Sequence, residues 1–289
     1  MLRYKILSGL ILSALFLGTA AAQDQPVFST VDYPGAVFTT ATGINPGGDI
    51  VGTYKDTLGH QHGYLFSGGN FTSIDYPGAI ATLANGISPG GDIVGSYNNA
   101  PGGPANLHGY LLSQGTFTEV QFPGYLGTIA QRITPNGDIY GCNHNYLMGP
   151  DMHGFVLSDA VYSQLDVVST MSNGATPDGS TIVGLYTDLT TGLTHGYFVQ
   201  NGSFEPFDVP GSNFTTAWDI NPSGTVVGVF RDTSGKVHGY LLADGAFTII
   251  DYPGAIATRA FGINPGGDVV GAYVDSGGKT HGFLRKVTD

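Results

Sequence analysis

One unit recurs along this chain about every 43 residues, and this repeat restricts the possible folds more than any other feature. His-Gly pairs follow one another at steps of 42 to 46 residues, beginning at His62, His108, His153, His195, His238 and His281. The residue that leads each DYPGA-like turn recurs with similar steps, at Asp32, Asp75, Gln121, Asp166, Asp208 and Asp251. A period of roughly 40–50 residues with four short strands per unit is typical of a β-propeller.

Each unit contains four runs with the pattern of short strands. In the second unit these runs cover residues 83–88, 92–97, 108–112 and 117–122. Gly-containing turns separate the first two runs and the last two, and glycine supplies the positive φ that tight hairpins need. No segment after residue 22 has a convincing helical period. We therefore predict an all-β chain in which residues 23–289 form a single six-bladed β-propeller with four-stranded antiparallel blades.

The two ends of the repeat region complete each other. Residues 28–36, FSTVDYPGA, read as a fourth strand without its first three, and residues 281–287, HGFLRKV, read as a third strand without a fourth. We predict that residues 27–34 form the outer strand of the last blade and close the ring, which removes an open edge.

A constant spacing connects the histidine of each third strand to the residue that leads the next turn. The two positions are 13 residues apart and face each other across a hairpin, where an opposite-charge pair contributes roughly 0.2–1 kcal/mol. We interpret them as structural pairs, because one histidine per blade is too far from the next to share a metal ion. The predicted pairs are His62–Asp75, His153–Asp166, His195–Asp208, His238–Asp251 and His281–Asp32, whereas His108 faces Gln121.

Residues 1–22 have the pattern of a signal peptide. Arg3 and Lys5 precede an apolar run of about a dozen residues, and Ala20, Ala21 and Ala22 supply a small-residue cleavage site. The run is too short to span a membrane comfortably, and no later segment is long enough. We expect an exported protein, secreted or periplasmic, that is a monomer and has no transmembrane segment.

The net charge of −12 excludes some classes of partner. Nucleic acids and anionic membranes require lysine and arginine to offset phosphate, so neither is expected. Cys142 is the single cysteine, so the chain has no internal disulfide, and we interpret it as a small strand residue. No cofactor or metal is predicted. Calcium is the alternative, at the DYPG turns and the loop carboxylates Asp56, Asp188, Asp232 and Asp275, but the spacing of a calcium loop is missing.

The repeat resembles the HAF family of extracellular repeats of bacterial secreted proteins. The motifs that carry the resemblance are, for example, GINPGGDVVGAY (residues 262–273) and HGYLLADGAFTIIDYPGA (residues 238–255), and it extends over essentially all of the chain after residue 22. The resemblance implies an extracellular repeat protein without an established activity. It assigns no catalytic residue.

Positions at which one unit departs from the repeat are candidates for a ligand site. An inner-strand glycine is replaced by Arg132 in the third unit and by Asp219 in the fifth, and we expect both to line the central channel. His144 lies two residues after Cys142 on the same strand face. The loop tyrosines Tyr33, Tyr76, Tyr125 and Tyr252 are candidates for stacking on sugars, and the alternative is that they pack on neighbouring blades.

These features favour a non-enzymatic binding or scaffold module with a glycan or a cell-envelope component as its ligand. One alternative is a polysaccharide lyase or hydrolase whose site lies at the channel mouth, around Arg132, His144 and Asp219. Another is a purely structural surface protein with no small ligand. No GxSxG, HExxH or CxxC motif supports a more specific reaction.

Overall fold

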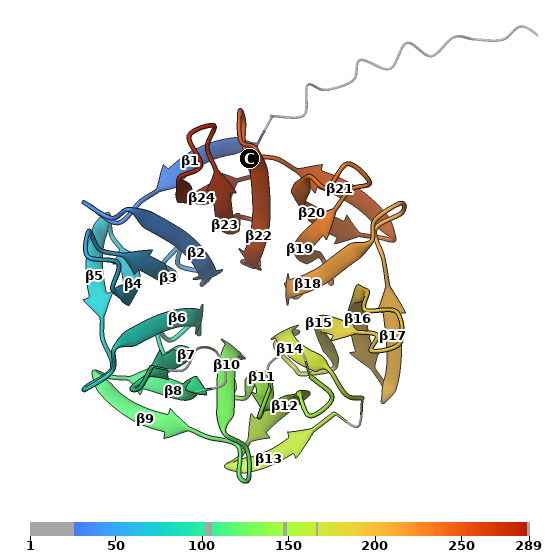
Figure 1. Cartoon of the computed structure of the whole chain (residues 1–289), viewed down its shortest axis with the longest axis horizontal. Coiled ribbons are helices and arrows are strands. Elements are labelled where there is room, and N and C mark those ends of the chain that lie inside the picture. Colours follow the sequence, from blue (N-terminus) through green and yellow to red (C-terminus); the bar gives the residue numbers. More distant parts are fainter. Residues whose placement is uncertain (1–25, 102–105, 147–148, 166, 288–289) are drawn as a thin grey trace, which may run out of the picture.

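A computed structural model describes residues 26–101, 106–146, 149–165 and 167–287. The strands of these residues form six four-stranded antiparallel blades around a central axis (Figure 1). The predicted six-bladed propeller is therefore confirmed. The predicted leader, residues 1–22, lies outside the described residues. Within the described part of the chain no helix is long and apolar enough to cross a membrane.

The strands follow one another from the axis outward in each blade. Blade 1 contains β2 (Phe38–Ile44), β3 (Ile50–Lys55), β4 (Gln61–Ser67) and β5 (Asn70–Ile74), and blade 2 contains β6 (Ala81–Ile87), β7 (Ile93–Asn98), β8 (His108–Ser113) and β9 (Thr116–Val120). Blade 3 contains β10 (Gly127–Ile133), β11 (Ile139–His144), β12 (His153–Ser158) and β13 (Val161–Gln164), and blade 4 contains β14 (Thr170–Ala175), β15 (Thr181–Thr187), β16 (Thr194–Gln200) and β17 (Ser203–Phe207). Blade 5 contains β18 (Phe214–Ile220), β19 (Val226–Arg231), β20 (Val237–Ala243) and β21 (Ala246–Ile250).

Blade 6 is made from both ends of the described chain. It contains β22 (Ala257–Ile263), β23 (Val269–Val274), β24 (Thr280–Lys286) and, as its outer strand, β1 (Val27–Val31) (Figure 1). β1 pairs antiparallel with β24, from Val27 opposite Lys286 to Val31 opposite Gly282. The strand ends three residues earlier than predicted, because a turn closed by the Ala36 N–H and the Tyr33 carbonyl oxygen follows it.

A glycine in each second strand makes room for an aromatic side chain of the third. In blade 5, a Cβ on Gly228 would lie 2.0 Å from the Thr216 carbonyl oxygen and 2.6 Å from the ring of Tyr240. That ring is fully buried and its hydroxyl donates to the same carbonyl oxygen. Equally close Cβ contacts with a carbonyl oxygen and an aromatic ring recur in every blade, so this glycine is a packing requirement rather than a turn residue.

The inner strands are crowded at the axis, as the small residues predicted. A Cβ on Gly86 would lie 2.6 Å from the Gln131 carbonyl oxygen, and one on Gly174 would lie 2.8 Å from the Cα of Asp219. Just before this glycine position every inner strand has a β-bulge, for example between Ala84 and Gly86. A bulge leaves one residue unpaired, so its carbonyl group is free for other partners.

Candidate binding site at the propeller axis

Two adjoining cavities lie at the axis, and both are formed mainly by the inner strands. A cavity of about 280 Å³ has walls from blades 1, 2 and 3, and one of about 360 Å³ has walls from blades 4, 5 and 6. Trp218 and Phe261 belong to the walls of both, with ring centroids 5.0 Å apart in an edge-on arrangement. We refer to the pair as the central cavities.

The inner strands alternate between residues that repeat and residues that do not. The repeating residues face the blade interiors and are almost fully buried: Thr39 and Ala41, Thr82 and Ala84, Thr128 and Ala130, Thr215 and Ala217, Thr258 and Ala260. The intervening residues line the central cavities and differ from blade to blade: Thr40 and Thr42, Leu83 and Asn85, Ile129 and Gln131, Thr216 and Trp218, Arg259 and Phe261. The repeat therefore builds the ring, and the residues outside the repeat make the cavity wall asymmetric.

Arg132 crosses the axis and contacts several blades. Its guanidinium nitrogens donate to the carbonyl oxygens of Asn85 at 2.5 Å, Thr42 at 2.9 Å and Phe261. These three residues are the bulge residues of blades 2, 1 and 6. The carbonyl groups that the bulges leave unpaired therefore accept hydrogen bonds from Arg132. Four glycines at the equivalent position in the other blades leave the space that this side chain fills.

Asp219 of blade 5 is the ion-pair partner of Arg132. Its Oδ2 lies 3.2 Å from Arg132 Nε and accepts the Ile263 N–H at 3.1 Å. Both side chains are nearly buried, at 11% and 12% exposure. Burial raises the pKa of Asp219, although Arg132 and the backbone N–H groups of Ile263 and Ile220 oppose this shift. Both residues do lie at the channel, as predicted, but they bind each other across it.

The Arg132–Asp219 pair lies between the 280 Å³ cavity and the opposite end of the channel. There a smaller cavity of about 100 Å³ is lined by both residues of the pair and by one proline of each turn between first and second strands: Pro46, Pro89, Pro135, Pro177, Pro222 and Pro265. Arg132 thus lines both this smaller cavity and the 280 Å³ cavity, whereas the 360 Å³ cavity is lined by neither residue of the pair.

The histidines of the third strands lie beside carboxylates in four of the predicted pairs. The closest nitrogen–oxygen distances, all from Nδ1, are 2.6 Å for His62–Asp75, 2.8 Å for His195–Asp208, 3.0 Å for His238–Asp251 and 2.7 Å for His281–Asp32. His108 Nδ1 lies 3.1 Å from Gln121 Oε1. His153 Nδ1 instead contacts the Leu165 carbonyl oxygen at 3.0 Å, and Asp166 lies outside the described residues.

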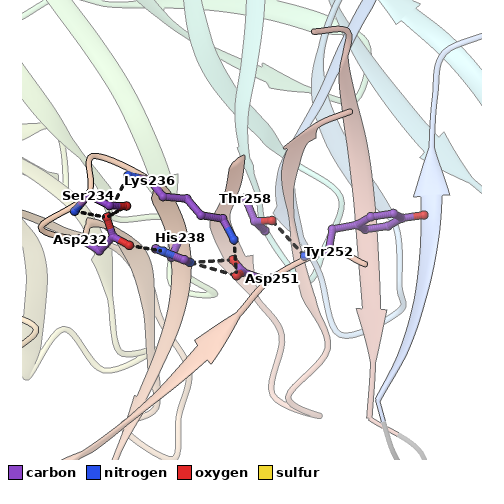
Figure 2. Close-up of polar contacts among 7 residues, drawn as sticks. All are labelled: Asp232, Ser234, Lys236, His238, Asp251, Tyr252 and Thr258. Carbon is purple, nitrogen blue, oxygen red and sulfur yellow. Dashed lines mark hydrogen bonds and ion pairs between the residues drawn. The ribbon is translucent and has the colours of Figure 1, made fainter. Parts of the chain in front are cut away.

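In blade 5 the histidine joins two carboxylates, as Figure 2 shows. His238 Nδ1 faces Asp251 and its Nε2 lies 3.3 Å from Asp232 Oδ2. Asp232 also accepts the Ser234 hydroxyl and the Lys236 N–H, and these hydrogen bonds, with that of His238, lower its pKa to about 2. Asp56, Asp188 and Asp275 accept the same kind of backbone hydrogen bonds in their own loops. Among the described residues no group of three His, Cys, Asp or Glu side chains is arranged to hold a metal ion.

The loop tyrosines pack between blades. Tyr33 stacks on Tyr54 of the following blade with ring centroids 3.6 Å apart, and Tyr54 stacks in turn on His62. Tyr76 and Tyr252 stack in the same way, on Tyr97 and Tyr273. Tyr125 is edge-on to Phe122. One ring face of each stacked tyrosine is therefore covered by the neighbouring blade, as in the packing alternative, and none of the four lines a central cavity.

His144 lies away from the Arg132–Asp219 pair. It is fully buried at the end of β11, opposite Gly127, whereas Arg132 lies near the other end of the same hairpin, opposite Tyr140. Burial raises the pKa of Cys142, whose Sγ is 3.8 Å from His144 Nδ1, so its thiol is not activated as a nucleophile. The structure therefore does not bring Arg132, His144 and Asp219 together as an acid, a base and a cation around one point.

Trp218 is the residue that the sequence interpretation missed. It is the single tryptophan of the chain and occupies the bulge position that holds Thr42, Asn85, Gln131, Asn173 or Phe261 in the other blades. The rule that selected Asp219 compares one blade with a residue that the other blades share, and the Trp218 position has no shared residue, so the rule could not select it. The sequence interpretation also missed Arg259, which lies two residues before the bulge residue of blade 6, at a position where the other blades have uncharged residues.

Comparisons with known proteins identify the fold. No family model and no curated protein match the sequence. Among solved structures, TolB from Acinetobacter baumannii matches with a TM-score of 0.58 and 14% identity over 82% of this chain, which covers 63% of that TolB. The chain is a β-propeller. A lectin from Aleuria aurantia in complex with Fucalpha1-6GlcNAc matches with a TM-score of 0.53 and 12% identity, over 89% of this chain and 93% of the lectin. The β-propeller domain of the Trilobed protease from Pyrococcus furiosus, which has an open velcro topology, matches with a TM-score of 0.52 and 12% identity, over 88% of this chain and 97% of that domain.

Proposed function

We propose that this protein is an exported, non-enzymatic binding module that holds a glycan or another cell-envelope component in the central cavities. The observation that carries the proposal is the asymmetry of the cavity wall. The inner-strand residues that repeat pack inside the blades, and the inner-strand residues that differ between blades line the central cavities. Five of the six inner strands contribute a different pair of side chains to this wall, as expected of a wall that recognises a ligand.

The chemistry of the wall suits a sugar. Trp218 and Phe261 present apolar ring surface, and the wall of the cavity shared by blades 1 to 3 also contains Asn85 and Gln131. The amide nitrogens of these two residues are bonded to the Ala130 carbonyl oxygen and to Met171 Sδ, so their amide oxygens are the polar groups left for a ligand. Sugar rings have apolar C–H faces and polar hydroxyl edges, so they need both kinds of partner. A few polar groups in a largely apolar cavity are typical of small-molecule sites.

Other observations support the class of function without defining the ligand. The lectin whose fold this chain shares was solved with a fucosyl disaccharide, which shows that a propeller of this size accepts sugars. The signal-peptide pattern of residues 1–22 supports export, and the HAF resemblance supports an extracellular role. Fold alone does not determine function, so the cavity residues carry the argument.

Incubation of the protein with a panel of soluble and insoluble polysaccharides tests the proposal. Both co-sedimentation and the release of new sugar ends are measured. We expect binding without release. Release of sugar ends would contradict the non-enzymatic assignment, and the absence of binding to every polysaccharide would contradict the choice of a glycan ligand.

A further inference from the structure

The charge around the central cavities is opposite to that of the whole molecule. The chain has 22 acidic and 10 basic residues, yet no Asp or Glu belongs to the described walls of the central cavities. Basic residues gather there instead. Arg132 and Arg259 are part of the walls. Two more cations lie over aromatic rings of these walls: Lys55 Nζ is 5.4 Å from the ring of Phe38, and Arg231 is 5.2 Å from the ring of Phe214.

Arg259 is the cation in this group that is placed to bind a ligand. Arg132 is already occupied by Asp219 and the bulge carbonyls. Arg259 is half-buried and makes no side-chain hydrogen bond or ion pair with the described residues. Burial and the nearby Arg231 lower the pKa of Arg259, and no carboxylate offsets them. An arginine in such a position gains a large stabilisation from an incoming anion.

The surroundings of Arg259 fit a ring with an apolar face next to the anion. Trp218, Phe261 and Phe214 share the cavity wall with Arg259, and the rest of the wall is formed by Leu185, Thr194, Thr216 and Val229. An acidic sugar has this combination of features, with a ring, hydroxyl groups and a carboxylate. A neutral sugar offers the Arg259 guanidinium only hydroxyl and ring oxygens, which offset its desolvation less than a carboxylate does.

We propose, as an extension of the function proposed above, that the central cavities bind an acidic saccharide through a carboxylate that pairs with Arg259. The sugar ring lies against Trp218 and Phe261. The net negative charge of the protein repels polyanions in general, so recognition depends on this local reversal of charge and on the cavity shape.

Trp218 is a built-in reporter for the test, because it is the single tryptophan and lies in the cavity wall. Tryptophan fluorescence is titrated with oligogalacturonate, oligoguluronate and hyaluronan oligosaccharides, each beside its methyl ester, which has the same rings without the charge. The variants are R259Q, R259K and the control R285Q. Arg285 lies on β24, opposite Phe28, and belongs to neither central cavity.

We expect at least one acid form to change the fluorescence, with its ester binding at least 10-fold more weakly. R259Q should weaken the acid form roughly 10- to 100-fold, as expected for loss of a hydrogen bond between charged groups. R259K should recover part of the affinity, and R285Q should bind like the wild type. Circular dichroism shows whether each variant is folded.

Two outcomes would overturn the inference in different ways. If acid and ester forms bind equally, or if folded R259Q binds like the wild type, the carboxylate pairing is wrong and the glycan-binding function stands. If no acidic saccharide changes the fluorescence but a neutral glycan does, the pairing of a carboxylate with Arg259 is likewise wrong and the glycan-binding function stands. If no saccharide of either kind binds, the inference fails together with the choice of a glycan as the ligand.

Discussion

Arg132 occupies a position at which four of the six blades have glycine, and its side chain joins the inner strands of five blades. Departure from the repeat was enough to select Arg132 and Asp219 from the sequence. Their contact was not predictable, because it depends on the reach of one side chain across the axis and on bulges that free the carbonyl groups of Thr42, Asn85 and Phe261. At this scale the sequence identifies the exceptional residue and the structure identifies its partner.

The R132M variant is expected to unfold more easily, and the effect should depend on pH. Removing Arg132 leaves the Asp219 carboxylate buried without its cation, which costs about 3 kcal/mol at pH 7. The same change raises the folded-state pKa of Asp219 further, while its unfolded pKa stays near 3.8. The folded variant therefore holds its proton more tightly than the unfolded chain does, and stability is lost as pH rises above about 4. Urea denaturation of wild type and variant at pH 4 and pH 7 measures the difference.

The double variant R132M/D219N is the control. With the charge of Asp219 removed, only the titration of Asp219 in the wild type is left in the stability difference, so its pH dependence should be much smaller than for R132M, and part of the stability should return. A difference between R132M and wild type that is equally large at both pH values would contradict the ion-pair explanation.

Strands were the most predictable elements, and contacts between blades the least. Runs such as residues 108–112 correspond to β8 because the turn glycines and the alternation of side chains define them locally. The stacking of Tyr33 on Tyr54 depends on how one blade meets the next, which a repeat pattern does not encode. The tyrosines that looked free for ligands in the sequence are therefore partly covered in the fold.

The glycine of the second strand provides a test of packing within a blade. The G228A variant places a Cβ against the Thr216 carbonyl oxygen and the Tyr240 ring, so we expect a loss of at least about 3 kcal/mol in the free energy of unfolding. G90A is the matched control, because the nearest atom to its new Cβ is the Ser88 Oγ at 3.7 Å. The control should change stability by less than about 1 kcal/mol. Equal stability of both variants would show that the second strand tolerates a side chain.

For the whole molecule, the incomplete repeats at both ends predicted the closure of the ring. β1 and β24 pair although about 250 residues separate them, and His281 lies beside Asp32 as the 13-residue spacing of the other hairpins implied. The cavities at the axis could not be located in this way. Their walls combine residues from all blades, and the sequence does not show which face of an inner strand turns to the axis.

Removal of residues 27–31 tests the closure. The deletion removes the buried Val31 and the Phe28 contacts and exposes β24 as an edge strand, so the Tm should fall by about 10 °C or more, with increased aggregation. Thermal unfolding followed by circular dichroism and light scattering measures both effects. An unchanged Tm would mean that β1 contributes nothing to the ring.

The central claim is that the ligand binds at the propeller axis and not at the stacked tyrosines between blades. The most direct measurement compares the affinities of W218L and Y76L for the polysaccharide that the wild type retains best, with folding of both variants verified by circular dichroism. We predict at least 10-fold weaker binding for W218L and wild-type binding for Y76L, because Trp218 lines both central cavities and Tyr76 lines neither. Wild-type binding by W218L together with loss of binding by Y76L would contradict the claim and place the ligand between the blades.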